Sequence, residues 1–353
     1  MTETKASKIT DAPVLVAVDD GYAMTKVVLS NGTKIKMPSL VRTGASSLTG
    51  SSEELPTYKT NVGEGTHGEQ GFFTATMASD IEAADTRYND YPYGALNRVM
   101  VHHALRQAGL GGQVVEVATS LPVHTFFNQD GQNKVNIARK NESIEQPVHA
   151  VAGLPCARVA KAHVFAEGVA AWLDYAISDE GTQRVALESP AAVIDIGGRT
   201  TDTVKVLVGM NVEKKASGTI NKGVLDLVKA IKLTIIRNPT IQEMFGDLQD
   251  SQVPRAMVEE VIRTGVFRKH ALNVDFSEEV AIARASIAAE IMKDVEQRVA
   301  KGFDLQSMLF VGGGSIVFKE EIKKHFATAV FVDEPEFANA RGMFKYLKHV
   351  IGR

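Results

Sequence analysis

The same short pattern occurs twice in this chain, and it constrains the fold more than any other feature. An apolar run ends in Asp, a Gly follows two residues later, small hydroxyl residues come next, and a second β-branched run returns. The two copies are VAVDDGYAMTKVVLSNG at residues 16–32 and AVIDIGGRTTDTVKVLVG at residues 192–209. Asp19 aligns with Asp195, half the length of the 353-residue chain away. Each copy predicts two strands joined by a tight turn.

Strands and helices alternate after each hairpin. Helical spacing of apolar residues predicts helices over 95–110, 163–177, 224–236 and 283–300, and a strand–GGG–helix unit spans 308–326. Residues 43–94 hold no long apolar run, which predicts loops and short elements. We therefore expect two α/β halves, each opening with a hairpin, and a cleft between them.

Composition excludes several classes of protein. Hydrophobic residues at 44% and charged residues at 23% are typical of a soluble globular protein. A net charge of −3 gives no general attraction to DNA or to an anionic membrane. The polar N-terminal stretch lacks the features of a signal peptide or an amphipathic anchor, and the single Cys156 excludes a disulfide framework. We expect a cytoplasmic protein.

The repeated turn has a chemistry of its own. A strand that ends in Asp-x-Gly presents a carboxylate at the edge where open α/β sheets bind ligands, and the Gly residues let backbone N–H groups surround an anion. One such turn is usually only a tight turn. Two aligned copies favour a shared ligand, a polyphosphate held from both sides, with Asp19 and Asp195 holding a hydrated Mg²⁺.

Two further features fit a nucleotide. The glycines at 312–314 predict a strand-to-helix turn, and they also suit close backbone approach to the base and ribose. Glu167 stands at the start of a predicted helix, where a carboxylate commonly stabilises the helix dipole. Beside a triphosphate it is a candidate for orienting or activating the attacking water.

Five segments together resemble the actin, heat-shock chaperone and sugar kinase superfamily of ATPases. They are the phosphate loops DDGYAMTK and VIDIGGRTTD, the adenosine motif LFVGGGSIVF, and the connecting helices AEGVAAWLDY and FANARGMFKYL. Within that superfamily the chain is similar to the plasmid-segregation actins of the ParM or StbA family. The marks of that family are VHHALRQAGL leading to EVATSLPVHTFF, then NIARK, SGTINKGVLDLVKAI, DVEQRV and VGGGSIVFKEEIKKH. The resemblance runs from about Leu15 to the C-terminus.

The resemblance implies an α/β protein with the actin-like ATPase fold: two duplicated RNase H-like domains with a nucleotide cleft between them. Domain I would span 1–188, with the first phosphate loop and a connecting helix. Domain II would span 189–335, with the second phosphate loop and the adenosine motif. The C-terminal helix within 336–353 would return to domain I.

The family's functional positions carry over residue by residue. Asp19 and Asp195 stand at the metal positions, acting on Mg²⁺ through water, and Glu167 and Asp195 stand at the catalytic positions. The positions implied to bind the nucleotide are Asp20, Gly21, Thr25, Lys26, Gly197, Gly198, Thr200, Gly223, Gly312, Gly313 and Gly314.

Two residues depart from the family pattern. Arg199 replaces a small Thr in the second phosphate loop, where it would contact phosphate, point to solvent or form an interdomain salt bridge. Tyr22 replaces a Ser of the first loop and removes a hydroxyl from the β-phosphate side, for which Thr25 is a candidate substitute.

The implied function is an ATPase, using ATP or GTP with Mg²⁺, that polymerises into helical filaments and becomes unstable after hydrolysis. Filament growth would segregate plasmid copies through a DNA-binding adaptor of the ParR type on centromere-like plasmid DNA, in the bacterial cytoplasm. The weak charge of the chain predicts no direct DNA binding and no membrane attachment. The segment 232–245 is unusually apolar for one that a Pro interrupts, which makes it a candidate filament contact.

Two alternatives remain open at this stage. One is an actin-like filament protein with another positioning task. The other is a small-molecule kinase of the same fold, although no dedicated catalytic Asp stands beyond the metal positions and Glu167. The adjacent His102 and His103 have no spaced metal partners and are interpreted as structural, and the aromatic stretch 87–93 packs on its own domain or meets a neighbouring subunit.

Overall fold

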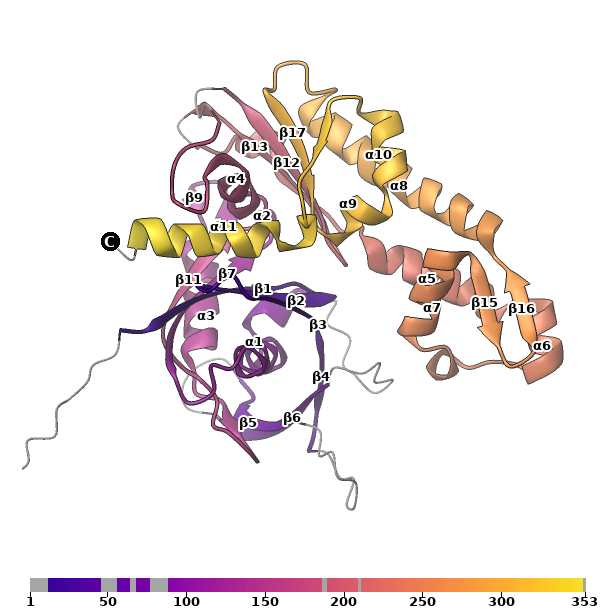
Figure 1. Cartoon of the computed structure of the whole chain (residues 1–353), viewed down its shortest axis with the longest axis horizontal. Helices are drawn as coiled ribbons and strands as arrows, with labels where there is room; N and C mark the ends of the chain where they lie inside the picture. Colours follow the sequence, from indigo (N-terminus) through magenta and orange to yellow (C-terminus); the bar gives the residue numbers. More distant parts are fainter. Residues whose placement is uncertain are drawn as a thin grey trace, which may run out of the picture.

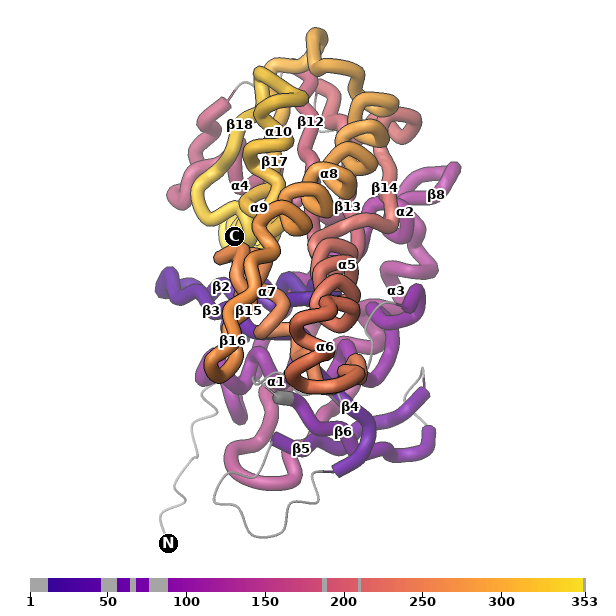
Figure 2. The backbone as a smooth tube through the Cα atoms, turned by 90° about the vertical axis from the view of Figure 1, so that its right-hand side faces the viewer, coloured from indigo at the N-terminus to yellow at the C-terminus, as the bar shows by residue number. Residues whose placement is uncertain are grey.

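The computed structural model describes residues 12–45, 56–63, 68–76, 88–185, 189–208 and 211–351. Two sheet-containing halves lie one above the other in Figure 1, and the side view in Figure 2 places β12 and β4–β6 at opposite ends of the molecule. The first half holds a five-stranded sheet, β11-β7-β1-β2-β3, and a four-stranded sheet, β10-β5-β6-β4. The second half is built on a five-stranded sheet, β14-β13-β12-β17-β18.

The elements of the first half enclose α1, which Figure 1 shows end-on inside a ring of strands. The strands are β1 (Val14–Asp20), β2 (Met24–Leu29), β3 (Lys34–Pro38), β4 (Leu40–Thr43), β5 (Thr57–Asn61), β6 (Gln70–Thr76), β7 (Val114–Leu121), β8 (Phe127–Asn128), β9 (Gly131–Gln132), β10 (His149–Ala150) and β11 (Arg158–Ala166). The helices before β12 are α1 (Ala95–Gln107), α2 (Val123–Phe126), α3 (Lys134–Glu145) and α4 (Val169–Ala176), and α4 packs on the sheet of the second half.

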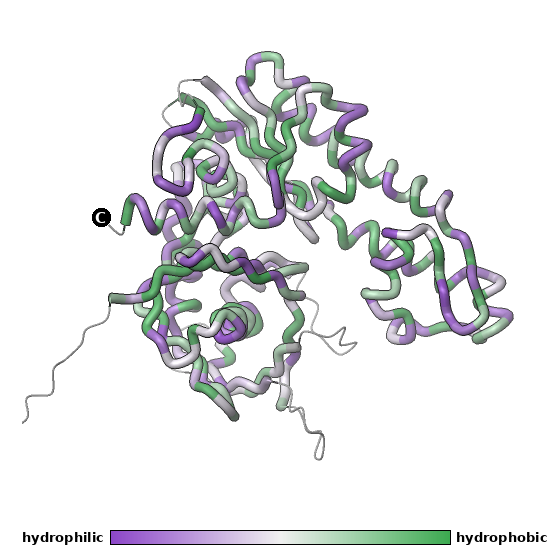
Figure 3. Tube along the Cα trace, viewed as in Figure 1, coloured by the Kyte–Doolittle hydropathy of each residue, from purple (hydrophilic) through white to green (hydrophobic). Residues whose placement is uncertain are grey.

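The second half carries its helices over the β12 sheet and in an outer part beyond it. Its strands are β12 (Ala191–Ile196), β13 (Thr201–Val206), β14 (Gly218–Ile220), β15 (Val266–Lys269), β16 (Leu272–Asp275), β17 (Ser307–Val311) and β18 (Ala329–Phe331). Its helices are α5 (Val224–Ile236), α6 (Pro239–Phe245), α7 (Arg255–Thr264), α8 (Ser277–Val299), α9 (Gly313–Val317) and α10 (Lys319–His325), and α11 (Ala338–Tyr346) follows. Figure 3 shows hydrophobic stretches along the β12 sheet, whereas α8 alternates between hydrophobic and hydrophilic turns.

The two hairpins repeat the same pairing. β1 is antiparallel to β2 and parallel to β7, and β12 is antiparallel to β13 and parallel to β17. In the first hairpin Asp19 lies opposite Lys26, and in the second Asp195 lies opposite Asp202. The register is therefore duplicated along with the sequence pattern, as expected.

Strand alternation explains how the two faces of each sheet are filled. Val16 and Val18 of β1 pack with α1, whereas Ala17 packs with α11. In the same way Ile194 of β12 packs with α5 and α8, and Val193 packs with α4. Because successive side chains point to opposite faces, both faces are buried and the strands are apolar along their length. Full burial of each such Val or Ile stabilises the fold by about 1.5–3 kcal/mol.

The last helix lies between the halves. α11 packs on β1 and α4, and a Cβ added at Gly342 would collide with the carbonyl of Ala170. Only glycine permits this close approach of two helix backbones. The predicted boundary at 335/336 falls within a short 3₁₀ helix, Pro335–Phe337, and residue 188 lies outside the described residues; both boundaries stay predictions.

One predicted helix is wrong in its first part. Residues 163–166 belong to β11, which pairs in parallel with β7, and α4 begins only at Val169 after Gly168 with a φ of 76°. Glu167 therefore lies between a strand end and a helix start. The predicted helices over 95–110, 224–236 and 283–300 are confirmed as α1, α5 and α8.

The structure also bears on the expectations for segment 43–94 and for His102 and His103. The segment 43–94 contains β5 and β6 as its short elements, and parts of it lie outside the described residues. His102 and His103 are buried on α1, where His102 Nε2 is 3.2 Å from the carbonyl of Ile144 and His103 Nδ1 is 2.7 Å from the hydroxyl of Tyr58. In the described part of the chain, no helix combines the length and hydropathy that a membrane span requires.

Candidate functional site

The two repeated turns face one cavity of 380 Å³ between the halves. Eleven of the residues that the sequence predicts for the site line it: Asp19, Gly21, Lys26, Glu167, Asp195, Gly197, Gly198, Thr200, Gly312, Gly313 and Gly314. They come from the ends of β1, β2, β11, β12 and β17. Segments far apart in sequence thus converge because an edge of the β1 sheet and an edge of the β12 sheet face the same cavity.

Of the two adjacent carboxylates in the first turn, Asp19 lines the cavity and Asp20 does not. Asp19 shares the strand face of Ala17 and forms an ion pair with Lys26, with 2.9 Å between its Oδ2 and the lysine Nζ. Asp20 shares the face of Val16 and Val18, and it points to the α1 side. Asp20 is therefore not among the residues that line the cavity, and its role as a nucleotide ligand stays a prediction.

Asp20 instead anchors the turn from behind. It accepts hydrogen bonds from Lys140, Thr119 and Asn97, and the Asn97 Nδ2 distance is 2.6 Å. Burial alone would raise the pKa of Asp20, but Lys140 and the three hydrogen bonds hold it below its usual range. Lys140 is fully buried, so this pair joins α3 to the end of β1. The NIARK motif supplies that lysine.

Thr25 also supports the first turn without lining the cavity. Its hydroxyl lies 2.9 Å from the hydroxyl of Ser39, which in turn donates to the carbonyl of Gly21 at 2.7 Å. Thr25 is fully buried. Its side chain is turned toward Ser39 and supports the first turn, and its place beside the phosphates stays a prediction.

The second turn is docked on the start of a helix. The backbone N–H groups of Val224 and Leu225 donate to the carbonyls of Gly197 and Gly198, at 3.1 and 2.8 Å. A Cβ added at Gly223 would lie 2.6 Å from the carbonyl oxygen of Gly197 and 2.5 Å from that of Gly198. Gly223 therefore packs closely behind the turn and is not among the residues that line the cavity, and its expected approach to a ribose stays a prediction.

The glycine-rich turn after β17 crosses close to Asp195. Gly312 has a φ of 78°, and an added Cβ would collide with Asp195 Oδ1. The other carboxylate oxygen of Asp195 accepts a hydrogen bond from Asn339 Nδ2 at 2.5 Å. Asn339 Oδ1 accepts a hydrogen bond from the N–H of Gly168, next to Glu167, at 3.1 Å. Asn339 of α11 thus links the Asp195 carboxylate to the backbone next to Glu167 by two hydrogen bonds.

Acidic groups dominate the electrostatics of the cavity. Burial, together with Asp202, Asp195 and Asp19, raises the pKa of Glu167 well above its usual range. Burial, Asp19 and Asp202 raise the pKa of Asp195 to about 7, although the positive charge of Lys26 lowers it. Burial opposes a charged Lys26, yet Asp19 and Asp195 raise its pKa. The cavity therefore favours binding of added positive charge.

Asp202 is a buried acid that the sequence interpretation missed. Its Oδ1 accepts hydrogen bonds from the N–H of Val123 at 2.8 Å and from the hydroxyl of Thr219 at 2.5 Å. It therefore ties α2 of the first half to β14 of the second. The signal was present in the repeat, since Asp202 occupies the hairpin position that Lys26 occupies in the first copy.

The residues present fit a hydrated metal ion. Among the described residues, no cluster of three or more His, Cys, Asp or Glu side chains could hold a metal directly. Mg²⁺ commonly keeps several waters and is bound by one or two carboxylates together with substrate phosphates. Asp19 and Asp195 are 4% and 6% exposed and line the same cavity, which suits contacts of that kind.

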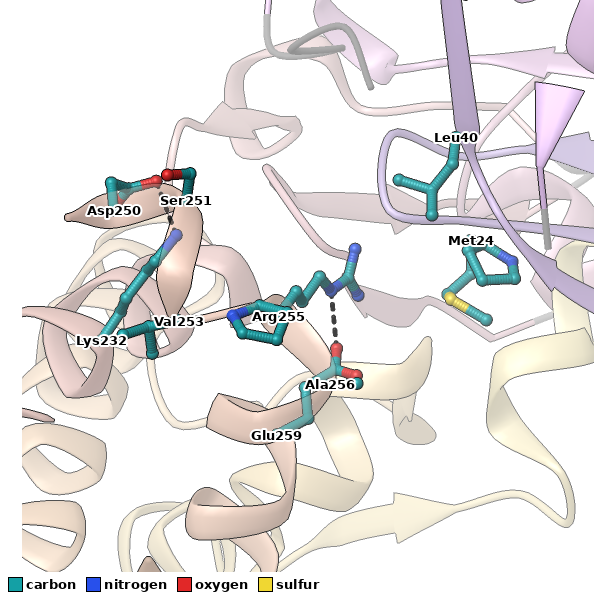
Figure 4. Close-up of a pocket in the computed structure, with 11 residues that line it drawn as sticks. Met24, Leu40, Lys232, Asp250, Ser251, Val253, Arg255, Ala256 and Glu259 are labelled. Atoms are coloured by element: carbon teal, nitrogen blue, oxygen red, sulfur yellow. Dashed lines mark hydrogen bonds and ion pairs between the residues drawn. The ribbon is translucent and has the colours of Figure 1, made fainter. Parts of the chain in front are cut away.

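A second cavity of 260 Å³ adjoins the first (Figure 4). Met24 and Leu40 approach it from the first half, and Val253, Arg255 and Ala256 approach it from the second. Arg255 pairs with Glu259 at 2.7 Å and reaches to 3.5 Å from the carbonyl of Ala23. Both walls carry apolar groups, so bringing the halves together here would bury apolar surface.

Comparisons with known protein families match the two halves separately. Residues 14–176 match the family "Plasmid segregation protein ParM, N-terminal", and residues 193–324 match "Archaeal actin homologue MreB-like, C-terminal". A comparison with curated protein sequences gives no match.

Solved structures resemble the chain over almost its whole length. Ta0583, an archaeal actin homolog, is 20% identical, with a TM-score of 0.74 over 95% of this chain and 99% of that one. Its complex with ADP gives a TM-score of 0.73 at 19% identity, with the same coverage of both chains. A 15-stranded ParM filament from Clostridium botulinum is 16% identical, with a TM-score of 0.71 over 96% of this chain and 99% of that one.

These likenesses agree with the sequence interpretation. The actin-like fold is confirmed, with two sheet-containing halves that align with actin homologues along nearly the full chain. The recognition of an actin-like protein with a ParM-type N-terminal part is confirmed as well.

Proposed function

We propose that this actin-like chain binds and hydrolyses ATP with Mg²⁺ and polymerises into filaments that segregate plasmid DNA through a DNA-bound adaptor. One observation carries the nucleotide part: both copies of the repeated turn, with Asp19, Lys26, Glu167 and Asp195, line a single cavity of 380 Å³. The ParM-type match of residues 14–176 and the likeness to a ParM filament support the filament and plasmid parts.

The two turns would hold the phosphates from opposite sides. The backbone of Gly21 belongs to the first turn, and Gly197 and Gly198 belong to the second. Glycines allow the backbone to approach a phosphate closely and to donate N–H groups to it. Lys26, released from Asp19, would donate to phosphate oxygens. The turn at 312–314 would pass the adenosine, a role supported by its place in the cavity wall.

Asp19 and Asp195 would hold Mg²⁺ through its waters, and the ion would neutralise charge that develops on the phosphates. The ion would also relieve the repulsion between the buried carboxylates that raises the pKa of Asp195. The archaeal neighbour solved in complex with ADP supports nucleotide binding by a chain of this fold.

Glu167 would orient the attacking water and accept its proton. It lies between β11 and α4, its N–H donates to the carbonyl of Leu121 at 2.9 Å, and it lines the cavity. A raised pKa suits a carboxyl that gains a proton during the reaction. Positioned proton transfer of this kind commonly contributes about 10²–10⁴-fold to a rate.

A nucleotide that touches both turns would favour one spacing of the halves. The apolar walls of the second cavity, with Leu40 on one side and Val253 on the other, would then meet. A closed conformer that presents matched surfaces to the next copy would grow head to tail, and such contacts give open filaments when they do not close into a ring.

A titration of nucleotide-free protein with ATP, with and without Mg²⁺, tests the site. Asp195→Asn is expected to weaken binding about 10-fold or more in Mg²⁺ and much less in EDTA, because its role is to hold the hydrated ion. Asp247→Asn, an exposed carboxylate, is the control. Equal affinity of native protein and Asp195→Asn in Mg²⁺ would contradict the metal role, and no ATP binding by the native protein would contradict the function.

The plasmid task has its own test and its own rival. We expect a small DNA-binding protein encoded beside this gene to co-sediment with the filaments in the presence of ATP. The match of residues 193–324 to an archaeal MreB-like family supports the rival, a filament with another positioning task. Filaments that form normally but capture no such adaptor would favour the rival.

A further inference from the structure

The two residues that depart from the family pattern lie against each other. Tyr22 comes from the turn after β1, and Arg199 comes from the turn after β12. The guanidinium carbon of Arg199 lies 5.1 Å from the centre of the Tyr22 ring. The same guanidinium donates to the side-chain oxygen of Asn89 at 3.1 Å. Arg199 thus crosses between the halves to an amide and a ring, and among the described residues it forms no interdomain salt bridge.

Arg199 turns away from the cavity. Tyr22 is among the residues of the cavity wall, whereas Arg199 is not. Its neighbours Gly198 and Thr200 do line the cavity. A guanidinium held at Asn89 is therefore not placed to bind phosphate, although it fixes the backbone of the turn that is placed to do so.

Asn89 belongs to an aromatic segment, residues 88–93, that is firmly attached to the first half. Tyr91 is 1% exposed, and its ring centre lies 5.6 Å from that of Tyr22. The guanidinium of Arg139 lies 4.2 Å from the centre of the Tyr93 ring. The expectation that this segment packs on its own domain is met for the residues that the structure describes; Arg87 lies outside them. Arg199 therefore reaches from the second half to exposed Asn89, two residues before the buried Tyr91 of the first half.

The contact joins the tips of the same two turns that a polyphosphate would join. An interaction that stabilises one spacing of the turns makes the binding free energy of a ligand that requires this spacing more favourable. The coupling is reciprocal, so the bound ligand stabilises the interaction by the same amount. A small Thr at position 199 or a Ser at position 22 could not span this distance. The two departures from the family pattern thus have one common explanation.

We propose that Tyr22, Asn89 and Arg199 form an interdomain clasp, and that Arg199 is a positioning residue that slows nucleotide release without contacting phosphate. The proposal depends on the proposed function for the identity of the ligand. The clasp itself joins protein groups only, so it can be tested separately. An exposed cation–π contact and a hydrogen bond from a charged group each contribute a modest free energy. The clasp is therefore expected to change nucleotide affinity moderately, while other residues provide most of the binding free energy.

The first experiment measures release of a fluorescent ADP analogue and steady-state hydrolysis. Arg199→Thr and Asn89→Ala are each expected to speed release and raise KM about 5- to 10-fold, with kcat at saturation within about twofold of native. Arg199→Lys keeps the cation over the ring but loses the planar donor fork, so it should restore part of the effect. Arg268→Thr, which changes an exposed arginine on β15, is the matched control and should match the native protein.

The second experiment needs no nucleotide. Amide hydrogen exchange of residues 88–94 and 197–200 is expected to accelerate in Arg199→Thr and in Asn89→Ala, and to stay unchanged in Arg268→Thr. Unchanged exchange in both clasp variants would overturn the clasp. A fall in kcat with unchanged KM would overturn the positioning role, since it would mean a contact made only in the transition state. Failure of the native protein to bind nucleotide would overturn the role in release as well as the proposed function, while the exchange result would still decide whether the clasp exists.

Discussion

Replacing Gly312 by Ala tests the account of the cavity most sharply, because the structure gives the cost. Gly312 has a φ of 78° and a ψ of 163°, a region that side-chain-bearing residues occupy at about 1–3 kcal/mol. The added Cβ would lie 2.5 Å from the carbonyl oxygen of Ile196 and closer still to Asp195 Oδ1. Asp195 must therefore move and weaken its hydrogen bond from Asn339, worth about 1.5–3 kcal/mol. We expect a loss of about 3–5 kcal/mol in the free energy of unfolding.

The next glycine is a matched control. A Cβ added at Gly313 meets no atom within 4 Å, and Gly313 begins α9, where Ala is a better helix former. Urea unfolding of both variants without nucleotide measures the difference in stability, and ATP titration with Mg²⁺ measures the effect of displacing Asp195. If Gly312→Ala unfolds within about 0.5 kcal/mol of Gly313→Ala, the reasoning about close approach is refuted.

Three further predictions follow from burial and exposure. Burial lowers the pKa of both His102 and His103 to about 4, whereas their pKa in the unfolded chain is near 6.5. The unfolded chain therefore binds their protons first as the pH falls, so the free energy of unfolding is highest above pH 6.5 and decreases toward pH 4. We expect a loss of about 2 kcal/mol per His between pH 7 and pH 5. Urea unfolding at the two pH values should show a smaller loss in His103→Gln. Met244 is 52% exposed in the predicted filament contact, so Met244→Glu should raise the critical concentration for assembly about 10-fold, whereas Val135→Glu, on another exposed face, should leave it unchanged. Lys26→Met removes the cation that is ion-paired in the first turn and should weaken ATP binding about 100-fold by titration; an unchanged affinity would exclude Lys26 from the phosphate site.

The duplicated fold could be predicted because each hairpin carries its own local signal. The apolar runs before Asp19 and Asp195 end in turn residues, and the pairing of β1 with β2 repeats in β12 and β13. The segment 163–177 failed because periodicity is ambiguous over short lengths. Phe165 fits the helical spacing of the residues after it, yet the parallel pairing with β7 makes it part of a strand.

In the candidate site, the local sequence predicts which residues lie at the turns, whereas contacts with residues distant in sequence decide which side chains enter the cavity. Adjacent residues on a strand face opposite sides, so only one of Asp19 and Asp20 could enter the cavity. Which one depends on α1 and α3, since Lys140 pairs with Asp20 from 120 positions away. The partner of Arg199 is equally distant in sequence, at Asn89. Contacts of this kind depend on how the halves pack, which no local pattern encodes.

The central claim is a filament whose lifetime is set by nucleotide hydrolysis at Glu167. Right-angle light scattering of purified protein with Mg-ATP, Mg-ADP and a non-hydrolysable ATP analogue, run beside Glu167→Ala, tests it most directly. We predict a rise in scattering with ATP that later decays, and a rise that persists in Glu167→Ala and with the analogue. No rise with any nucleotide, together with ATP turnover that begins only when a small substrate is added, would contradict the account and indicate a kinase of the same fold.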